Sequence, residues 1–585
     1  MTSPPDLTSP APNGEATPWL EPWCAARVLH VDSRVLVVDK PSGLPVHGGN
    51  VELAEDVVTR LGAWLQARGE SSYLAVHQRL DQGTSGVLFL LRDAELNKAV
   101  AEEMEAHRSE RRYLAVVSGT SPILGKRGSQ VFEDRLLTRK AHGQLRVEVS
   151  SRGKPARTRC KVLKRVGERA LLELCPETGR THQLRVQLAS RGLPILGDTL
   201  YGGAPASRLL LHCQSLGLAS LDLQAEAPMP ELFSEALSEP PTGPTEASFT
   251  AIPRGNELAR CLDDALSRRW PLRDTCDVLR LVHEYGDGLP GLSADAYGKW
   301  VALSIYTPEA LEQAPFIAEH LLERGFAGVY LKQRVRADLR RADQQALAPN
   351  EVFRGEPTPA ELQVREGQLK FLVDLQDGLS TGLFVDQRDN RARVLGSARS
   401  LRVLNLFSYT CSFSVAAAVG GARETISVDL SGRYLAWGEK NLALNGVAGP
   451  DQRLLKADAA DYLRRAIKRE ERFELIILDP PSFGSHGKKS FSIQRDYKAL
   501  AADALRLLTP GGRLLAVTNH RKTSPERFQR WLEEAALDAR CKLESLRPSP
   551  TPHDCPAWPT FANGPRGAHA TQSVGPTKAV WLTRR

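Results

Sequence analysis

Four short apolar runs, each followed by a segment with helical patterning, occupy the last third of this chain of 585 residues. The runs are LRVLNLF, TISVDL, ELIILDP and GRLLAVT, and they begin at residues 401, 425, 474 and 512. Strands buried on both faces of a parallel sheet show such continuous apolar runs, and their connections are usually helices. The alternation therefore predicts a doubly wound, Rossmann-like α/β sheet, which we assign to residues 377–585.

The front half of the chain shows a different pattern. Residues 28–46 are short β-branched runs that end in Pro and Gly turns. Residues 94–107 predict a helix, and the following segment RRYLAVVSG predicts a strand. Further strand-like segments continue to about residue 225, so we expect an α+β domain over residues 25–237.

Three further segments are expected from composition and turn signals. Residues 1–24 are rich in Pro, Ser and Thr and predict a disordered tail rather than a signal peptide. A Pro-, Glu-, Ser- and Thr-rich stretch predicts a linker at 238–256. Between this linker and the parallel sheet, strand and helix signals predict a small α+β subdomain over residues 257–376.

Composition excludes several classes of protein. Hydrophobic residues make up 42% of the chain, and no apolar run is long enough for a membrane span. The nine cysteines are scattered and form no Cys-x-x-Cys pair, which argues against a disulfide framework or a metal site and for a cytoplasmic location. The net charge of +8 suits a polyanionic partner.

A basic stripe is predicted near the middle of the front domain. The segment SRGKPARTRCKVLKR holds seven basic residues and no acidic residue. If this segment is a strand, Arg157, Arg159 and Lys161 share one face because side chains alternate along a strand. The alternatives are a solvated strand face and a track for RNA phosphates, and we favour the phosphate track.

The parallel sheet contains the elements of a nucleotide-type cofactor crevice. An acidic residue after the second strand can accept hydrogen bonds from ribose hydroxyls, and the turn after the first strand can hold the remainder of a cofactor. This turn lacks a Gly-rich fingerprint, so binding of a dinucleotide is disfavoured. The candidate cofactor-binding residues are Asn405, Ser408, Tyr409, Asp429, Asp458 and Asp479.

The segment Asp479-Pro480-Pro481 directly follows the apolar run ELIIL, where such sheets bind ligands. Its prolines stiffen the loop and direct the following aromatic residue, Phe483, toward a planar base. A rigid turn without function is the alternative. Its place after a cofactor-like half-sheet favours a pocket for the base that accepts a methyl group.

A second candidate site lies 398 residues earlier, at Arg79-Leu80-Asp81. The segment VHQRLDQGTSGVLFLL resembles the active-site motif of the RluA-like pseudouridine synthases. The segments VLVVDKPSGLPVH, RRYLAVVSG, ETGRTHQLRVQLAS, GLPILGDTLYGG and RLLLHC resemble the same family in order. This resemblance, over residues 27–235, implies an α+β fold with a mixed, mainly antiparallel sheet.

The resemblance also implies roles for single residues. Asp81 would be the catalytic aspartate, Tyr113 would pack against the target base, and Arg185 would pair with the aspartate. Arg79 and Arg180 would contact the substrate. Formation of pseudouridine breaks a glycosidic bond and requires a flipped-out base with a carboxylate near the sugar, and a basic partner keeps such a carboxylate ionised.

Residues 278–585 resemble the class I S-adenosylmethionine-dependent methyltransferases of large-subunit rRNA. The segments that carry this resemblance are RLVHEYGDGLPGL, STGLFVDQRDNR, VLNLFSYTCSFSVAAAVGGA, VDLSGRYLAWGEKNLALNG, LDPPSFG, IQRDYKAL and LLTPGGRLLAVTNHRK. The resemblance implies S-adenosylmethionine as the cofactor and no metal. Cys411 stands where such relatives usually have Gly.

The methylated base is predicted from a residue that is missing. Methylation of cytosine C5 requires a Cys nucleophile, which relatives on that branch carry after the TPGG strand. Here the corresponding segment reads TNHRK, without Cys. Guanine N7 already has an exposed lone pair and requires no general base, so positioning can supply most of the catalysis. We therefore expect methylation of guanine N7 in rRNA.

These observations lead to the hypothesis of a bifunctional RNA-modifying enzyme that acts on rRNA and possibly tRNA, without an obligate protein partner. One alternative is a monofunctional rRNA methyltransferase, possibly for 5-methylcytosine, with a non-catalytic RNA-binding front domain. Another is a non-catalytic ribosome-assembly factor.

Overall fold

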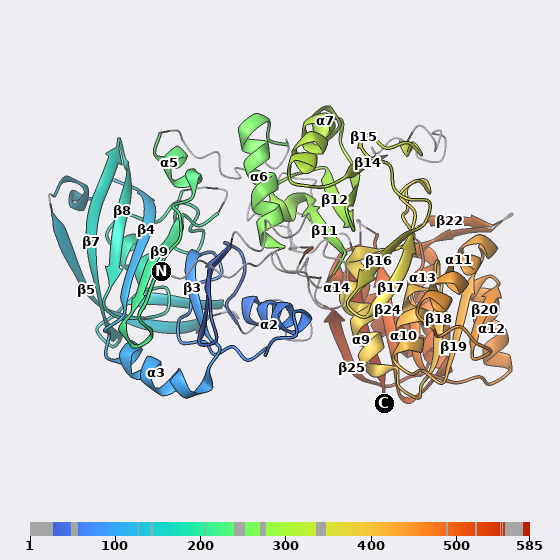
Figure 1. The fold of residues 1–585 in the computed structure, drawn as a ribbon. Helices are drawn as coiled ribbons and strands as arrows, with labels where there is room; N and C mark the ends of the chain where they lie inside the picture. Colours follow the sequence, from blue (N-terminus) through green and yellow to red (C-terminus); the bar gives the residue numbers. More distant parts are fainter. Residues whose placement is uncertain are drawn as a thin grey trace. The chain divides into compact units, whose positions relative to one another are not determined.

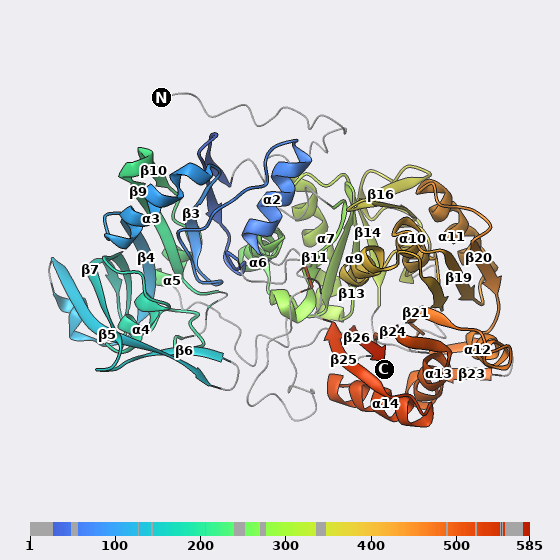
Figure 2. The same ribbon diagram turned by 90° about the horizontal axis from the view of Figure 1, so that it is seen from below.

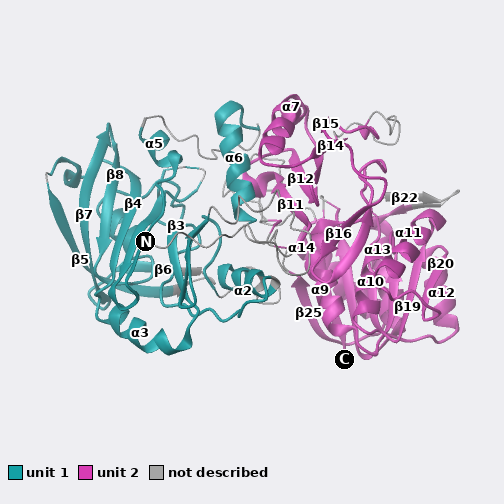
Figure 3. Ribbon diagram, in the orientation of Figure 1, with its two compact units in different colours: residues 1–275 teal, residues 276–585 magenta. Residues whose placement is uncertain are grey.

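The computed structural model describes residues 27–47, 56–126, 128–141, 144–204, 206, 208–238, 252–269, 276–334, 347–481, 483–486, 489–520, 523–549, 552, 554–555 and 577–585. The predicted tail 1–24 and most of the predicted linker 238–256 lie outside these residues. The chain forms two compact units, Met1–Thr275 and Cys276–Arg585 (Figure 3). No helix in the described part is long and apolar enough to cross a membrane.

The first unit is built on one mixed sheet with strand order β1-β2-β3-β9-β4-β8-β7-β5-β6, and β10 pairs with β9 (Figure 1). Among the described strands of this sheet, only β3 and β9 pair in parallel, which confirms the predicted mixed, mainly antiparallel sheet. The strands are β1 (Val28–Val31), β2 (Val35–Lys40), β3 (Ser85–Leu91), β4 (Glu110–Ser118), β5 (Ser129–Ala141), β6 (Gln144–Val149), β7 (Lys154–Val166), β8 (Arg169–Pro176), β9 (Leu211–Leu218) and β10 (Leu223–Glu226). The helices of this unit are α2 (Val57–Ala67), α3 (Asn97–Glu105), α4 (Gln183–Ala189), α5 (Glu231–Ser238) and α6 (Gly255–Arg268).

Helix α6 packs with the first unit, although it follows the predicted linker. The Arg27 guanidinium donates to Ser267 Oγ at 3.0 Å, and the Arg60 guanidinium donates to the Arg268 carbonyl oxygen at 3.2 Å. The sequence instead predicts that the accessory subdomain begins at residue 257. An amphipathic pattern shows that a helix buries one face, but it does not show which neighbour covers that face.

The second unit begins with two small sheets. The larger sheet has the strand order β11-β12-β13-β14-β15, and α7 connects its parallel pair β13 and β14. The smaller sheet is a hairpin of β16 and β17. These elements are β11 (Val278–His283), β12 (Leu292–Tyr297), β13 (Trp300–Ile305), α7 (Pro308–Glu323), β14 (Gly328–Gln333), β15 (Arg354–Gly355), β16 (Leu362–Glu366) and β17 (Leu369–Val373). They form the predicted α+β subdomain.

The large sheet of the second unit has the order β20-β19-β18-β21-β24-β26-β25. Its first five strands pair in parallel, and β26 is antiparallel to both of its neighbours. The strands are β18 (Arg402–Leu406), β19 (Glu424–Asp429), β20 (Gln452–Lys456), β21 (Phe473–Leu478), β24 (Leu508–Thr518), β25 (Leu543–Ser549) and β26 (Lys578–Arg584), and β22 (Phe483–His486) pairs with β23 (Lys489–Ser492).

Helices cover both faces of this sheet, which confirms the doubly wound prediction (Figure 2). One hydrophobic cluster joins the sheet to α12, α13 and α14, and another joins it to α9, α10 and the hairpin of β16 and β17. The apolar run of β21 is almost wholly buried between these layers, as expected for a central parallel strand. The helices are α9 (Arg388–Ser397), α10 (Ser412–Val419), α11 (Gly432–Leu444), α12 (Ala459–Lys468), α13 (Ile493–Leu507) and α14 (Pro525–Asp538).

Two candidate active sites

Asp81 lies in the turn that leads into β3. The Thr84 amide donates to the Asp81 carbonyl oxygen at 2.9 Å and closes this turn. Gly86, at φ +107°, lies against β9, and a Cβ atom there would be 2.1 Å from the Cys213 carbonyl oxygen. Glycine is therefore required at this close approach, which fixes where β3 begins relative to Asp81.

An ion-pair chain holds the Asp81 carboxylate. Arg185 on α4 donates from Nη1 to Asp81 Oδ2 at 3.2 Å, and from Nε and Nη2 to the two oxygens of Asp198 at 2.8 Å each. The Asp198 side chain is fully buried, whereas that of Asp81 is 25% exposed. The bidentate pair with Asp198 fixes the guanidinium, which then presents one further N–H to Asp81.

A cavity of about 470 Å³ opens beside this pair, lined by Gly43, Asp81, Gln82, Gly83, His182 and Arg185. Its walls are tied together by the backbone, because the Gly43 amide donates to the Gln82 carbonyl oxygen at 2.8 Å. The buried Lys40 Nζ donates to the carbonyl oxygens of Pro41, Leu44 and Gln82 at 3.0, 2.7 and 3.2 Å. Burial lowers the pKa of Lys40 to about 7.

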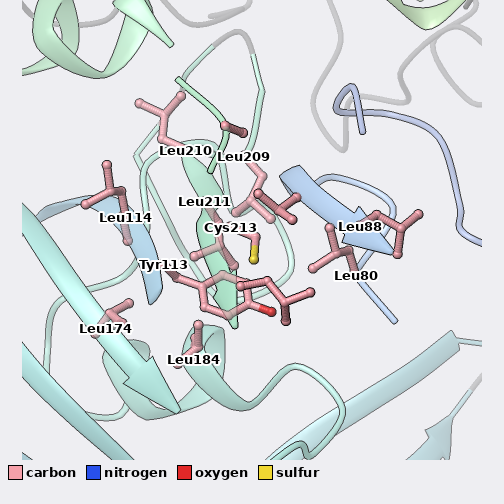
Figure 4. Close-up of a cluster of buried hydrophobic side chains, with 14 of the residues drawn as sticks. Leu80, Leu88, Tyr113, Leu114, Leu174, Leu184, Leu209, Leu210, Leu211 and Cys213 are labelled. Carbon is pink, nitrogen blue, oxygen red and sulfur yellow. The ribbon is translucent and has the colours of Figure 1, made fainter. Parts of the chain in front are cut away.

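Tyr113 lies in the hydrophobic core of this unit. Its ring packs among Leu80, Leu184 and Cys213 (Figure 4). The residue is 7% exposed, and burial raises the pKa of its hydroxyl. Tyr113 is not among the residues that line the cavity, so its contact with the target base stays a prediction.

The predicted substrate-binding arginines occupy different environments. Arg79 is exposed, and Arg180 donates from Nε to the Pro155 carbonyl oxygen at 3.0 Å. On β7, Arg157, Arg159 and Lys161 are exposed while the intervening residues are buried, so the three share one face as predicted.

Part of this positive charge is compensated by neighbouring carboxylates. Arg157 pairs with Glu133 at 3.1 Å and with Glu177 at 3.2 Å, and Arg159 pairs with Glu177 at 3.1 Å. These glutamates come from the segments before and after β7 in the chain. A count of charges within one segment therefore could not reveal them.

The second site is a pocket of about 990 Å³ at the carboxyl ends of the parallel strands. It is lined by Asn405, Ser408, Tyr409, Asp429, Asp458, Asp479, Pro480 and Pro481, which are the residues expected there from the sequence. The side chain of Phe483, also expected there, lies outside the described part of the structure.

The turn after β18 has an unusual backbone. Phe407, Tyr409 and Cys411 have φ angles of +58°, +49° and +62°, a region that residues other than glycine rarely adopt. Asp429 stabilises this turn, because its Oδ2 accepts from the Tyr409 amide at 2.9 Å and its Oδ1 from the Ser431 amide at 2.8 Å. Each carboxylate oxygen has a second lone pair, so Asp429 can still accept from a ribose hydroxyl.

Cys411 leaves the pocket open even though relatives usually have Gly at this position. Its side chain is buried and is not among the residues that line the pocket. Gly438 on α11 makes this orientation possible, since a Cβ atom there would lie 2.4 Å from Cys411 Sγ. Burial raises the pKa of the Cys411 thiol to about 11, so this sulfur is not a nucleophile at neutral pH.

Asp479 is the most perturbed carboxyl of the pocket. Burial, and to a smaller extent the neighbouring Asp386 carboxylate, raises its pKa to about 7 against the opposing effect of Arg391. Arg391 is itself paired with Glu366, with 2.7 Å between Nε and Oε1, which limits its effect on Asp479. The buried Tyr497 on α13 donates its hydroxyl to the Leu478 carbonyl oxygen at 3.4 Å and supports the start of the Asp-Pro-Pro loop.

Several site residues were missed by the prediction. In the first site these are His182, Asp198 and Tyr201, which lie within the segments that carry the synthase resemblance. In the second site they are Phe384 and Asp386, within STGLFVDQRDNR, and also Tyr434 and Asn519. The motifs could have suggested them, but nothing in a motif separates residues that face a pocket from residues that support its wall.

Comparison with known proteins confirms both resemblances. Residues 34–190 match the RNA pseudouridylate synthase family, and residues 327–557 match the S-adenosylmethionine-dependent methyltransferase family. Ribosomal RNA large subunit methyltransferase I from Erwinia tasmaniensis is 33% identical over 299 residues, which cover 51% of this chain and 75% of that protein. Ribosomal RNA large subunit methyltransferase K/L from Allochromatium vinosum is 37% identical over 350 residues, which cover 56% of this chain and 44% of that protein.

A solved structure is similar to the front domain. Human RNA pseudouridylate synthase domain containing 4 is 27% identical, covers 37% of this chain and 96% of its own length, and has a TM-score of 0.31. Together the two family matches assign an isomerase domain and a transferase domain to the chain, with S-adenosylmethionine as the cofactor and RNA as the class of substrate. Among the described residues, no group of three or more His, Cys, Asp or Glu is placed to hold a metal ion.

Proposed function

The chain belongs to the family of large-subunit rRNA methyltransferases and also carries a pseudouridine synthase domain, and from this premise we propose that both of its sites are active. The front site converts uridine to pseudouridine in rRNA or tRNA. The rear site methylates an rRNA base at guanine N7. The ion pairs that join Asp198, Arg185 and Asp81 carry the first assignment. The second rests on a pocket whose described lining residues include no cysteine.

In the synthase half, Asp81 is the proposed catalytic carboxylate. The Arg185 guanidinium donates to it at 3.2 Å and fixes its position beside the cavity, and a carboxylate is a group able to act at the sugar C1′ or C2′. The cavity of about 470 Å³ beside the carboxylate is roomy enough for a flipped-out uracil. Arg79 and Arg180 are proposed to contact the RNA around this base.

In the methyltransferase half, the pocket of about 990 Å³ is at the upper end of the range for small-molecule sites, which leaves room for both a cofactor and a base. Asp429 and Asp458 would hold the ribose and the adenine side of S-adenosylmethionine, and Asn405, Ser408 and Tyr409 would line the rest of its site. The cofactor supplies an electrophilic methyl group on a cationic sulfur. Carboxylates are suitable neighbours for such a cation.

The choice of guanine over cytosine rests on the residues that line this pocket. None of the described lining residues is a cysteine, and the Cys411 thiol is turned away with a raised pKa. The carboxylates of Asp386 and Asp479 are hydrogen-bond acceptors, which suits the N1–H and N2–H donors on one edge of guanine. N7 lies on the opposite edge, where its lone pair requires no base.

An aromatic face for the target base is also present. Phe384 is 46% exposed at the pocket, and its ring centroid lies 5.5 Å from that of Tyr409. The Arg391 guanidinium donates to the Phe384 carbonyl oxygen at 2.9 Å and fixes its backbone. Stacking on such a ring stabilises an extruded base by roughly 1–3 kcal/mol.

The proposal is tested by mapping modified nucleosides in rRNA and tRNA from a deletion strain and from strains that carry single-site variants. We expect loss of one 7-methylguanine and of at least one pseudouridine in the deletion strain. Asp81→Asn should abolish the pseudouridine alone, and Asp479→Asn the methylated base alone. Loss of 5-methylcytosine with 7-methylguanine unchanged would contradict the assignment of guanine, and unchanged pseudouridine in every strain would leave the front domain as an RNA-binding platform.

A further inference from the structure

His182 occupies a distinctive place in the cavity beside Asp81. It immediately precedes α4, lines the cavity together with Asp81 and Arg185, and is half-buried. Its φ angle is +51°, a backbone conformation that costs about 1–3 kcal/mol and persists only where the surrounding structure holds it. Residues in such conformations cluster at active sites. We propose that His182 is a further catalytic residue, whose Nε2–H donates a hydrogen bond to a carbonyl oxygen of the departing uracil.

The tautomer of His182 follows from its hydrogen-bond partners. His182 Nδ1 lies 2.8 Å from the Tyr201 hydroxyl oxygen, and that oxygen also accepts from the Val147 amide at 3.0 Å. The hydroxyl hydrogen then has one described acceptor, which is Nδ1 of His182. Because Nδ1 accepts, the proton of the neutral ring is on Nε2. That N–H has no partner among the described residues.

Charged neighbours hold this arrangement in place. The groups that face His182 are Asp81, Arg185 and Asp198, and burial is the largest influence on the ring, lowering the pKa of His182. The Arg185 guanidinium lies 5.1 Å from the centre of the Tyr201 ring, and Tyr201 in turn packs edge-on against the His182 ring at 5.6 Å. One cluster therefore positions both the carboxylate and the imidazole.

This hydrogen bond acts at the step that breaks the glycosidic bond. The bond between N1 and C1′ breaks with its electron pair on the uracil, and the charge spreads from N1 onto O2 and O4. A donor aimed at one of these oxygens stabilises the charge as it develops, and His182 keeps its proton throughout. As this bond breaks, the Asp81 carboxylate compensates C1′ for the lost electron pair, by bonding to C1′ or by taking the C2′ proton. The uracil then turns, C5 bonds to C1′, and the Asp81 carboxylate is released in its starting form. The C5 proton passes to water, and N1 takes a proton from water.

The inference rests on the proposed function of the Asp81 site, so the experiment includes variants of both His182 and Asp81. Tritium release from 5-tritiated uridine in RNA is measured with the full chain. We expect His182→Ala to lower kcat by about 10²–10³-fold with little change in KM, because a donor used mainly in the transition state is lost. His182→Gln, whose amide can still donate, should recover activity to within about tenfold of the unchanged protein.

A matched control is His107→Ala. His107 also has a positive φ angle, +56°, but it is exposed and lies outside the cavity, so tritium release should not change. Tyr201→Phe keeps the aromatic ring but removes the donor to Nδ1, and kcat should fall by about tenfold or less. Unfolding of each variant, followed by circular dichroism, separates loss of a donor from loss of the fold.

The pH profile separates a donor from a base. A histidine donates from Nε2 whether it is neutral or cationic, so His182→Gln should leave the shape of the profile unchanged. If His182→Gln were as inactive as His182→Ala, or if it removed a rise of rate with pH, His182 would be a base and the inference would be wrong. If Asp81→Asn still released tritium, the proposed site itself would be wrong, whatever His182 does.

Discussion

The two sites use aspartate in opposite electrostatic settings. Asp81 pairs with Arg185 at 3.2 Å, and a second carboxylate, Asp198, holds that arginine. Asp479 is buried beside a second carboxylate, Asp386, and burial, with a smaller effect of Asp386, raises its pKa to about 7. The comparison shows that burial and neighbouring charges, rather than the residue type, determine the setting of each aspartate.

The difference matches the proposed chemistry of each half. A carboxylate that acts directly at a sugar carbon must be ionised, and a paired arginine favours that form. A carboxyl that binds the edge of a base beside a cationic cofactor can instead be poised near neutrality, because binding of a positive charge favours its ionisation. The following changes test this comparison, from the largest expected effect to the smallest.

The largest effect is expected from Asp81→Asn. Loss of the proposed reacting carboxylate should lower tritium release by on the order of 10⁴-fold or more, while methyl transfer by the same preparation stays unchanged. Asp222→Asn is a matched control, because Asp222 is exposed and its φ of +49° is tolerated by asparagine. Equal loss of both activities would show that the two sites are not independent.

Asp479→Asn should lower methyl transfer by about 10²-fold and leave tritium release unchanged, because the amide places a donor where the base is proposed to donate. With a pKa of about 7, the carboxylate of the unchanged protein forms as pH rises, so kcat/KM for methyl transfer should increase between about pH 6 and 8. The variant should lack this increase. The exposed Asp451→Asn should retain it.

The raised pKa of Asp479 also predicts how stability depends on pH. Between about pH 4 and 7 the folded protein binds a proton at Asp479 that the unfolded chain has released. The stability that this proton confers is therefore fully present below about pH 4 and is lost as pH rises to about 7. In denaturant unfolding of the second unit, the free energy of unfolding should fall less steeply between about pH 4 and 7 in Asp479→Asn than in the unchanged protein. An equally steep fall in both proteins would contradict the raised pKa of Asp479.

A smaller effect is expected at the contact between Cys411 and Gly438. Gly438→Ala places a methyl group 2.4 Å from Cys411 Sγ and should lower the free energy of unfolding of the second unit by about 1–3 kcal/mol, with weaker binding of S-adenosylmethionine. Adding Cys411→Gly should restore most of both losses. Gly396→Ala is the control, because that helical glycine has open space around it and alanine there should be neutral or stabilising. Additive effects of the first two substitutions would show that they do not interact.

The smallest effects are expected on the exposed face of β7. Lys161→Ala should weaken RNA binding a few-fold and reduce the slope of log Kd against log salt by roughly 0.7–0.9, as for the loss of one phosphate contact. Glu177→Gln should strengthen binding, because it releases Arg159 from its ion pair and Arg157 from one of its two ion pairs. Lys98→Ala, on α3, serves as the control. No change with Glu177→Gln would place the RNA on another surface.

The sequence alone predicted the broad architecture of both units. The apolar runs from residue 401 predicted the parallel sheet, because continuous burial on both faces leaves a visible pattern. The ordered motifs of the front half predicted the mixed sheet. The residues expected at the strand ends line one pocket, since the carboxyl ends of neighbouring parallel strands necessarily meet at one edge, and their role in binding the cofactor stays a prediction.

Only the tertiary structure decided which residues share each site and in what state. His182 lines the Asp81 cavity from the residue before α4, and Asp198 and Tyr201 hold Arg185 and His182 from a later loop. The orientation of Cys411 depends on the absence of a side chain at Gly438. The environments of Asp81 and Asp479 depend on groups brought close by folding. Sequence patterns record burial and local geometry, whereas charges and hydrogen bonds act through space between segments that lie far apart in the chain.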